Sequence, residues 1–210
     1  VLITAGPTRE YVDPIRFLSN RSSGKMGFAL AKVARRRGAE VILISGPSIA
    51  EPPQDVGLVR VETAKEMFGA VMEHLGEATT VIMAAAVADY TPVVTAMAKL
   101  EKTDAMTLNL TKTDDILESV GRTEGRPFTV GFAAETGEKT GRARKKLGRK
   151  HADLIVFNNV LKPGSGFDVD TNEVVLIDAG GEKRLPLMSK ERTADAILDR
   201  VRELKGHGQE

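Results

Sequence analysis

The sequence contains no cysteine, and its three histidines, His74, His151 and His207, lie far apart along the chain. Without cysteine the protein can form no disulfide, no thiolate nucleophile and no cysteine-based zinc site, which fits a reducing compartment. The histidines also lack the H-x-x-x-H spacing that places two ligands on one face of a helix. Thiol chemistry and a histidine or cysteine metal cluster are therefore excluded.

Long hydrophobic runs are absent as well, since no apolar stretch approaches the roughly 18 residues of a membrane span. No signal peptide precedes the first apolar run, so we expect a cytoplasmic protein with no membrane partner. The net charge is only +1, which gives no overall field for steering nucleic acid. Because the chain starts directly on a strand pattern without a methionine, we expect it to be part of a longer polypeptide.

The 210 residues are 41% hydrophobic and 28% charged, which is ordinary for a globular protein. Short apolar runs alternate with helical patterns, which indicates an α/β fold. We predict a Rossmann-like, mostly parallel sheet with helices on both faces, in a single domain over residues 1–205 with a disordered tail at 206–210. The predicted strands are 1–4, 41–44, 59–62, 107–110, 128–134 and 153–158, with a further buried apolar segment at 81–90, and a C-terminal β-hairpin joins 173–178 to 183–187.

The first 27 residues have the layout of a phosphate site. The strand at 1–4 ends on Ala5-Gly6-Pro7, where Gly permits a tight turn and Pro ends strand pairing. A polar loop follows, and Ser22, Ser23 and Gly24 open a helix from about Lys25 to residue 37. The free N–H groups and the dipole at the start of a helix favour an anion.

Neither common phosphate motif is present in this region. A Walker A loop fails because Ser19 stands at its first Gly position and Met26 follows Lys25. The dinucleotide fingerprint G-x-G-x-x-G fails because Pro7 and Thr8 follow Gly6. Spacing alone therefore leaves open a solvated loop that caps an ordinary helix.

Two later segments offer further candidates. The apolar run from residue 81 becomes alanine-rich and ends at Asp89, which suits a ligand site at the carboxyl end of a parallel strand, although such an Asp is often a turn or cap residue. The helix that ends near Lys150 is strongly basic, and Lys146 and Lys150 share a face on which they could bind a triphosphate. A solvated face explains most of its other cations, and also the three arginines at 35–37.

The residue identities in the N-terminal region are more specific than the spacing of its glycines. The strings GPTRE at 6–10, DPIRFLSN at 13–20 and SSGKMG at 22–27 closely resemble phosphopantothenoylcysteine synthetases, including the synthetase half of bacterial bifunctional coenzyme A biosynthesis proteins. The resemblance extends over essentially the whole chain. It implies a homodimer with a shared active site and, in the full-length protein, a preceding flavin-dependent decarboxylase domain.

The reaction implied by this resemblance joins phosphopantothenate to L-cysteine in two steps. The phosphopantothenate carboxylate attacks the α-phosphorus of CTP to give an acyl-cytidylate and pyrophosphate, and the cysteine amine then displaces CMP. No covalent enzyme intermediate is required, so the absence of cysteine from the chain is no obstacle. The protein has to position the reactants and stabilise charge, with the help of Mg²⁺.

The resemblance also assigns roles to positions in this chain. It implies catalytic roles for Asn20, which handles the acyl-cytidylate, and for Lys99, which stabilises charge as this intermediate forms. Arg16 matches an arginine that reaches the substrate across a dimer interface. Lys99 opens a segment that reads Lys-Leu-Glu-Lys, in which the third position, Glu101, is acidic where the family has lysine.

The remaining assignments concern the nucleotide, the substrate and the cation. The nucleotide-contact positions are Gly6, Ser22, Gly24, Gly27, Ala85, Asp89, Lys99, Asp115, Ile116, Leu117, Phe132, Lys146, Lys150 and Asn158. The substrate positions are Arg16, Asn20, Ala85, Ala86 and Asp89, and Asp89 is also the candidate ligand for Mg²⁺. Asp114 replaces a proline that is usual in the family, and CTP in place of ATP follows only from the bacterial character of the match.

Two other functions remain open from the residues alone. A nicotinamide-dependent oxidoreductase would share the alternation of strands and helices, but the missing fingerprint and the position of Glu40 before the second strand disfavour it. A nucleotide-binding module without turnover would keep the pocket but need neither Asn20 nor Lys99. The presence of both residues argues against such a module through the resemblance only.

Overall fold

The computed structural model describes residues 1–48 and 51–206, and its centre is one eight-stranded sheet. The strand order is β12-β11-β10-β9-β6-β1-β4-β5, in which the six strands from β10 to β5 are parallel and the last two along the chain pair antiparallel. The bounds are β1 Leu2–Ala5, β4 Ile42–Ser45, β5 Gly57–Arg60, β6 Thr80–Met83, β9 Phe128–Glu135, β10 Leu154–Asn159, β11 Thr171–Asp178 and β12 Gly181–Ser189.

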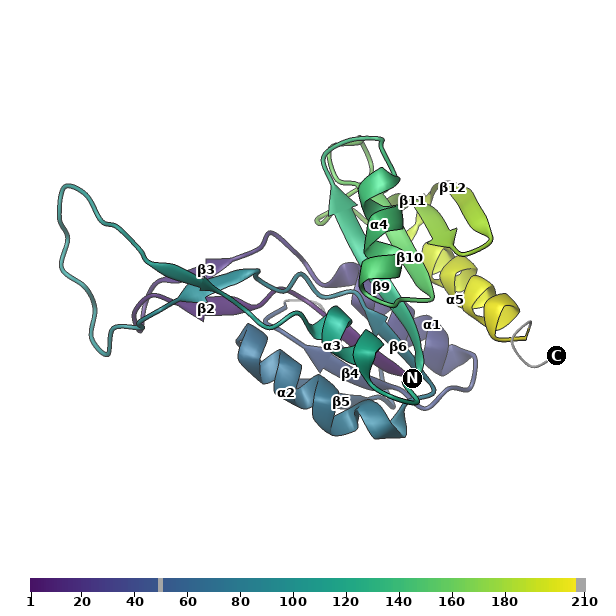
Figure 1. Ribbon diagram of the computed structural model, residues 1–210, viewed down its shortest axis with the longest axis horizontal. Helices are drawn as coiled ribbons and strands as arrows, with labels where there is room; N and C mark the ends of the chain where they lie inside the picture. Colours follow the sequence, from purple (N-terminus) through teal and green to yellow (C-terminus); the bar gives the residue numbers. More distant parts are fainter. Residues whose placement is uncertain (49–50, 207–210) are drawn as a thin grey trace.

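Helices cover both faces of this sheet, as predicted (Figure 1). Helices α1 (Lys25–Arg36) and α5 (Lys190–Gly206) pack on one face. Helices α2 (Ala64–His74), α3 (Ile116–Arg122) and α4 (Gly141–Arg149) pack on the other, with the short 3-10 helix η1 (Leu75–Glu77) after α2. The central strands are therefore buried on both sides, which explains why they read as continuous apolar runs.

The topology fixes where a ligand site is expected. From β1 the chain moves outward to β4 and β5, then returns to β6 on the other side of β1 and continues to β9 and β10. The strand order thus reverses between β1 and β6. In open parallel sheets the crevice beyond the carboxyl ends of such strands is where ligands bind.

Helix boundaries follow the local signals in the sequence. Thr63 and Glu66 form a complete capping box at the start of α2, as their spacing predicted. At the C-terminal end of α1, Gly38 adopts a φ of 85°, which is suited to glycine, after the basic residues Arg35 and Arg36. Ser189 accepts a hydrogen bond from the N–H of Arg192 at the start of α5.

An arm projects from the sheet, and the sequence predicted it only in part (Figure 1). The polar loop expected before α1 contains the hairpin β2 (Arg9–Tyr11) and β3 (Phe17–Ser19). A second ribbon pairs β7 (Tyr90–Pro92) with β8 (Leu110–Lys112), so the strand predicted at 107–110 lies further along the chain. Residues 93–109 form the long connection between them, in agreement with the predicted loop or arm.

The C-terminal hairpin is present as β11 and β12, and it extends the central sheet. Gly206, predicted as the first residue of a disordered tail, is instead the last residue of α5, and the rest of that predicted tail, residues 207–210, lies outside the described part of the chain. Over residues 1–48 and 51–206, no helix combines the length and the hydropathy that a membrane-spanning segment requires.

Candidate functional site

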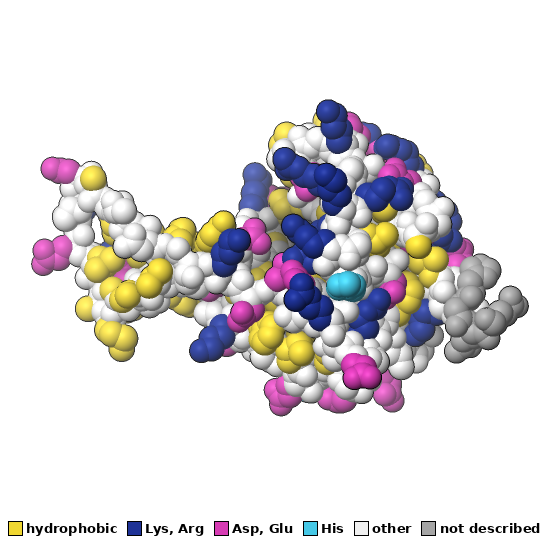
Figure 2. All heavy atoms as spheres, viewed as in Figure 1, with side chains coloured by type: hydrophobic (Ala, Val, Ile, Leu, Met, Phe, Trp, Pro, Cys, Tyr) yellow, Lys and Arg dark blue, Asp and Glu magenta, His cyan; other side chains and the backbone are white. Residues whose placement is uncertain are grey.

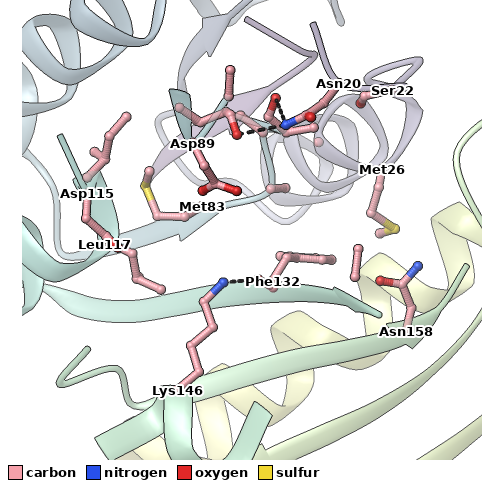
Figure 3. A pocket seen from close by; sticks show the side chains of 18 of the residues that line it. Asn20, Ser22, Met26, Met83, Asp89, Asp115, Leu117, Phe132, Lys146 and Asn158 are labelled. Atoms are coloured by element: carbon pink, nitrogen blue, oxygen red, sulfur yellow. Dashed lines mark hydrogen bonds between the residues drawn. The ribbon is translucent and has the colours of Figure 1, made fainter. Parts of the chain in front are cut away.

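A cavity of about 1520 Å³ opens beyond the carboxyl ends of β6, β9 and β10, beside the start of α1. It therefore lies at the topological switch point. Most of the predicted site residues line it: Asn20, Ser22, Gly24, Gly27, Ala85, Ala86, Asp89, Asp115, Ile116, Leu117, Phe132, Lys146, Lys150 and Asn158. Figure 3 shows several of these side chains directed into the cavity from opposite walls.

The start of α1 forms one wall and is built for an anion. Gly24 is the residue before the helix and adopts a φ of 76°, a conformation that glycine adopts without strain. Among the described residues no side chain caps this helix, and its first turn carries no acidic residue. The N–H groups of that turn and the helix dipole thus remain available to a negatively charged ligand.

Gly6 and Gly27 support this wall through close packing. A Cβ at Gly27 would come within 2.5 Å of the Cβ of Ala5, so the absence of a side chain lets α1 lie directly on β1. Gly6 does not line the cavity. It has a φ of 75°, and a Cβ there would meet the carbonyl oxygen of Gly46 at 3.0 Å. Gly27 thus allows α1 to pack on β1, and Gly6 allows the turn after β1. These packing roles explain both glycines even if neither contacts a ligand.

Two buried threonines join the loop after β1 to the loop after β6. Thr4 accepts a hydrogen bond from the N–H of Ala85 at 3.2 Å, and Thr8 accepts one from Ala88 at 3.0 Å. Both threonines are fully buried. The Nδ2 of Asn20 reinforces this junction by donating to the carbonyl oxygens of Ala86 and Val87, at 3.3 and 2.9 Å (Figure 3). The alanine-rich wall is therefore held in place before any ligand binds.

Lys146 projects from α4 across the carboxyl end of β9. Its Nζ donates to the carbonyl oxygen of Phe132 at 2.7 Å (Figure 3). Burial lowers the pKa of Lys146, while the carboxylates of Asp115 and Asp89 act in the opposite direction. A phosphate in the cavity would supply the negative charge that this half-buried ammonium lacks.

Lys150 differs from Lys146 because carboxylates already hold it. Its Nζ lies 2.5 Å from Oδ2 of Asp115 and 2.6 Å from Oε2 of Glu118, and the residue is only 5% exposed. Burial alone would lower the pKa of Lys150, but the hydrogen bonds that its ammonium donates to Asp115 and Glu118 outweigh burial and raise this pKa. Asp115 also caps α3 by accepting from the N–H of Glu118. Lys150 thus braces α3 against α4 and is not a free phosphate ligand in this state.

Asp89 is exposed in the cavity, and its carboxylate points into the cavity (Figure 3). No group of three or more His, Cys, Asp or Glu side chains suited to a metal occurs among the described residues. This does not conflict with Mg²⁺, which proteins commonly hold through one or two carboxylates together with substrate phosphates. A single carboxylate facing Lys146 and the α1 wall fits a cation that arrives with a nucleotide.

The loop of residues 164–170, which we call the strap, crosses the start of α1. Lys25 contacts Asp170 at 2.7 Å, Arg21 contacts Asp168 at 2.6 Å, and the hydroxyl of Ser23 donates to the carbonyl oxygen of Phe167. The ammonium of Lys190, which is 5% exposed, donates to the carbonyl oxygens of Gly166 and Val169. Burial, followed by the charge of Lys25, lowers the pKa of Lys190 to about 8.

Two of the predicted catalytic and substrate residues lie elsewhere. Arg16 and Lys99 do not line the main cavity, and both line a second hollow of about 720 Å³ on the arm. Figure 2 shows the arm as a projection with many hydrophobic side chains at its surface, beside a body whose hollow is bordered by cations. The structure therefore brings the nucleotide positions together in one place and these two cations together in another.

Sequence reasoning missed several supporting residues. Thr4 gave no signal beyond its place at the end of an apolar run, and Thr8 gave none beyond its place in the string GPTRE. Lys190 and Phe167 are far from the other site residues in sequence, and only the hairpin of β11 and β12 brings them to the cavity. A lysine at the first position of a helix, where cations oppose the dipole, was the one available hint for Lys190.

The fold and the cavity define a doubly wound α/β domain with a cavity at its switch point. A family model described as DNA/pantothenate metabolism flavoprotein C-terminal domain matches residues 1–204, and the chain belongs to this family.

Similar proteins include the coenzyme A biosynthesis bifunctional protein CoaBC of Vibrio vulnificus (strain YJ016), which is 47% identical over 211 residues. That match covers 99% of this chain and 53% of the relative. The CoaBC protein of Bacillus subtilis (strain 168) is 47% identical over 204 residues, with 96% and 50% covered. The chain therefore spans about half the length of the curated relatives it matches.

Solved structures agree with the fold. The crystal structure of the C-terminal domain of a CoaBC protein is 40% identical and has a TM-score of 0.84, with 98% of this chain and 95% of that chain covered. A mutant of Cab2 in complex with phosphopantothenate-cysteine is 15% identical, with a TM-score of 0.79 and coverage of 100% and 88%. At that identity the likeness shows a shared fold.

Proposed function

We propose that this domain is a phosphopantothenate-cysteine ligase of coenzyme A biosynthesis that uses CTP. The phosphopantothenate carboxylate attacks the α-phosphorus of CTP, the bond to the bridging oxygen breaks, and pyrophosphate leaves with that electron pair. The cysteine amine then attacks the acyl carbon of the acyl-cytidylate, loses a proton and displaces CMP. The observation that carries the proposal is the cavity at the switch point, where an uncapped helix start faces Lys146 and Asp89.

Each wall of the cavity has a role in this proposal. The N–H groups at the start of α1 and the ammonium of Lys146 hold the triphosphate, because both are directed at negative charge in a partly desolvated space. Asn20 holds the alanine-rich wall and contacts the phosphopantothenate portion. Asp89 would hold Mg²⁺, which neutralises phosphate charge when it is bound.

We further propose that Arg16 and Lys99 act in the cavity of a second copy. Both side chains lie on the arm, away from the main cavity of their own chain. The arm exposes large apolar side chains, which is the usual mark of an interface: Ile15, Phe17, Tyr90, Val93, Val94, Met97, Met106 and Leu110. A homodimer in which each arm reaches the partner's cavity would bury this surface and complete two sites.

The full-length protein is also part of the proposal. Because the curated relatives are bifunctional and this chain spans about half of their length, we propose a fusion to a flavin-dependent decarboxylase domain. Phosphopantothenoylcysteine, the product of the ligase, would then be the substrate of that second domain.

Pyrophosphate release is the experiment that tests the ligase function. We expect release only when CTP, Mg²⁺ and phosphopantothenate are all present, and we expect CMP release and product only after cysteine is added. A thermal-shift measurement with NADPH provides the comparison with an oxidoreductase, which NADPH would stabilise and CTP would not. Protein that neither releases pyrophosphate nor gains stability from CTP or ATP would reject the proposal.

Two substitutions test the division of labour within the reaction. Replacing Asn20 with alanine should let the acyl-cytidylate accumulate, because its conversion is impaired after it forms. Replacing Lys99 with alanine should slow formation of this intermediate by about 10²–10³-fold, the usual cost of removing a group that stabilises developing charge. Quenched-flow analysis of the intermediate separates the two steps, and identical behaviour of both variants would contradict this assignment.

A further inference from the structure

Asp13 is a fully buried carboxylate in the turn between β2 and β3, and the ligase proposal gives it no role. Its side chain accepts hydrogen bonds from both the local turn and a segment far along the sequence. The turn contributes the N–H groups of Ile15 and Arg16, and the distant donor is the N–H of Leu100, the residue after Lys99. The Arg16 side chain also donates to Asp13, with Nη2 2.6 Å from Oδ2.

The two oxygens of Asp13 divide these contacts between them. Oδ1 accepts from Ile15 at 2.9 Å and from Arg16 at 2.8 Å, which is all that the local turn requires. Oδ2 accepts from Nε of Arg16 at 2.8 Å and from the N–H of Leu100 at 3.2 Å. Stabilising the turn alone would explain Oδ1 but not the contact to a residue 87 positions later.

Leu100 is held on both sides of its backbone. Its N–H donates to Asp13, and its carbonyl oxygen accepts from Nη2 of Arg16 at 2.7 Å. The neighbouring Lys99 side chain is exposed, and no described residue forms an ion pair with it. The backbone beside Lys99 is therefore fixed, while its ammonium stays available to a ligand.

The surrounding donors also keep Asp13 ionised. Burial by itself would raise the pKa of Asp13, but the N–H groups of Arg16 and Ile15, the Arg16 guanidinium and the N–H of Leu100 outweigh it. The pKa is held well below its usual value, so the carboxylate accepts from all of its partners at neutral pH. An amide of the same shape would direct N–H groups toward some of these donors.

We propose that Asp13 is a positioning residue that joins Arg16 and the Lys99 segment into one rigid unit, so that both cations reach the substrate anions in a fixed geometry. This inference rests on the proposed ligase function. Asp13 itself touches neither nucleotide nor substrate and acts through the cations that it positions. The substrate class it serves is a doubly anionic ligand that carries a carboxylate and a phosphate.

Asp13→Asn and Glu10→Gln form a matched pair for the test. Glu10 is also a buried acid of the arm, 3% exposed, but its carboxylate accepts from the N–H of Ala64 at the start of α2 and does not touch the Lys99 segment. We expect Asp13→Asn to lower kcat for CTP-dependent pyrophosphate release by about 10²-fold, as a misplaced group does, with little change in the KM for CTP. Glu10→Gln should leave kcat within about twofold of wild type, since it anchors only α2.

A double-mutant cycle with Lys99→Ala distinguishes positioning from general loss of structure. If Asp13 acts through Arg16 and Lys99, Asp13→Asn should slow the Lys99→Ala protein by much less than the roughly 10²-fold expected in wild type. It should slow a protein that carries both Arg16→Ala and Lys99→Ala by less than about twofold, because residues that act as one unit are not additive. Multiplicative effects of the two substitutions would overturn the proposal. Leu100→Pro provides a second variant if Asp13→Asn does not fold: it removes the N–H donated to Asp13 and also restricts the backbone of Lys99, and it should slow pyrophosphate release similarly.

Amide hydrogen exchange separates this inference from the ligase function. In Asp13→Asn, exchange over residues 97–103 should accelerate by at least about tenfold, while Glu10→Gln leaves it unchanged. Unchanged exchange in Asp13→Asn would overturn the positioning role whatever the activity. A wild-type protein that is inert toward CTP and phosphopantothenate would instead reject the proposed function, and the exchange measurement would still decide whether Asp13 holds the segment.

Discussion

The cavity wall and the arm both carry candidate functional residues, but the two regions differ in how deeply the surrounding side chains are buried. The cavity wall is built on strands buried between two layers of helices, and its supports, such as Thr4, Thr8 and Lys150, are almost completely enclosed. The arm is made of two-stranded ribbons that leave large apolar side chains in solvent, with Met97 94% exposed and Val94 78% exposed. The nucleotide positions of the cavity are therefore enclosed within one chain, whereas the apolar side chains of the arm are left uncovered.

This difference suggests how the site is divided. Two-stranded ribbons are marginally stable in water by themselves, and exposed apolar side chains that lie together are typical of an interaction surface. A second copy would supply that partner and bring Lys99 and Arg16 to a cavity that already holds the nucleotide positions. If body and arm differ in this way, matched substitutions in the two regions should have unequal effects.

The largest expected effect concerns the brace in the body. Lys150→Met removes an ammonium that is 7% exposed and leaves Asp115 and Glu118 side by side without a counter-charge. We expect a loss of about 3 kcal/mol in the free energy of unfolding, at the low end for a broken buried pair because the Asp115 side chain is 49% exposed. Urea unfolding followed by circular dichroism measures this difference.

The matched control is an exposed cation of the arm. Arg9 lies 3.8 Å from Glu62, with the two side chains 37% and 49% exposed. Arg9→Met should change the free energy of unfolding by less than about 1 kcal/mol, as is usual for surface pairs. Equal losses in Lys150→Met and Arg9→Met would remove the energetic distinction between body and arm.

The next effect concerns association through the arm. Val94→Asp places a charge on the proposed interface and should raise the dimer dissociation constant by about tenfold or more, since burying a valine contributes about 1.5–3 kcal/mol. Leu161, which is 70% exposed on the body, gives the control, and Leu161→Asp should leave association unchanged. Sedimentation at several concentrations measures both constants, and equal shifts would place the interface elsewhere.

The last effect concerns the strap and appears only above about pH 8. The pKa of Lys190 is about 8 in the folded protein, against 10.5 for an unperturbed lysine, so between these values the unfolded chain binds more protons. The free energy of unfolding of wild type relative to Lys190→Met should therefore rise with pH from about 8 to about 10.5 and stay constant below 8. Lys25, Asp168 and Asp170 lie nearby and are present in both proteins, so the difference between wild type and Lys190→Met isolates Lys190. If this free-energy difference instead decreases as the pH rises from about 8 to about 10.5, the lowered pKa is not that of Lys190.

Much of the fold could be predicted from periodicity, because the strands of a parallel sheet are buried on both faces and read as apolar runs. The capping box at Thr63 and the turn at Gly180 set element boundaries closely. The hairpin of β2 and β3 was missed because its strands are only three residues long and, apart from Glu10, are exposed or partly buried, so they show no apolar run.

Site residues that lie in a recognisable local sequence pattern were predicted. Contacts that only the tertiary structure brings together were missed. Gly24 precedes a helix pattern, Asp89 ends an apolar run and Lys146 lies on a helix face. Sequence patterns alone therefore point to these three residues. The engagement of Lys150 by Asp115 and Glu118 joins two helices and has no sequence signature. The distance of Lys99 from the cavity likewise depends on the direction of the arm, which no local pattern sets.

Mixed dimers of Asn20→Ala and Lys99→Ala test the division of the site most directly. If Lys99 acts in the partner's cavity, a mixed dimer has one site with both substitutions and one with neither. Random mixing of two nearly inactive proteins should then restore about a quarter of the wild-type rate of product formation, because half of the dimers are mixed and each has one intact site of two. If each arm served its own cavity, every site would carry one substitution, and mixing would restore no activity.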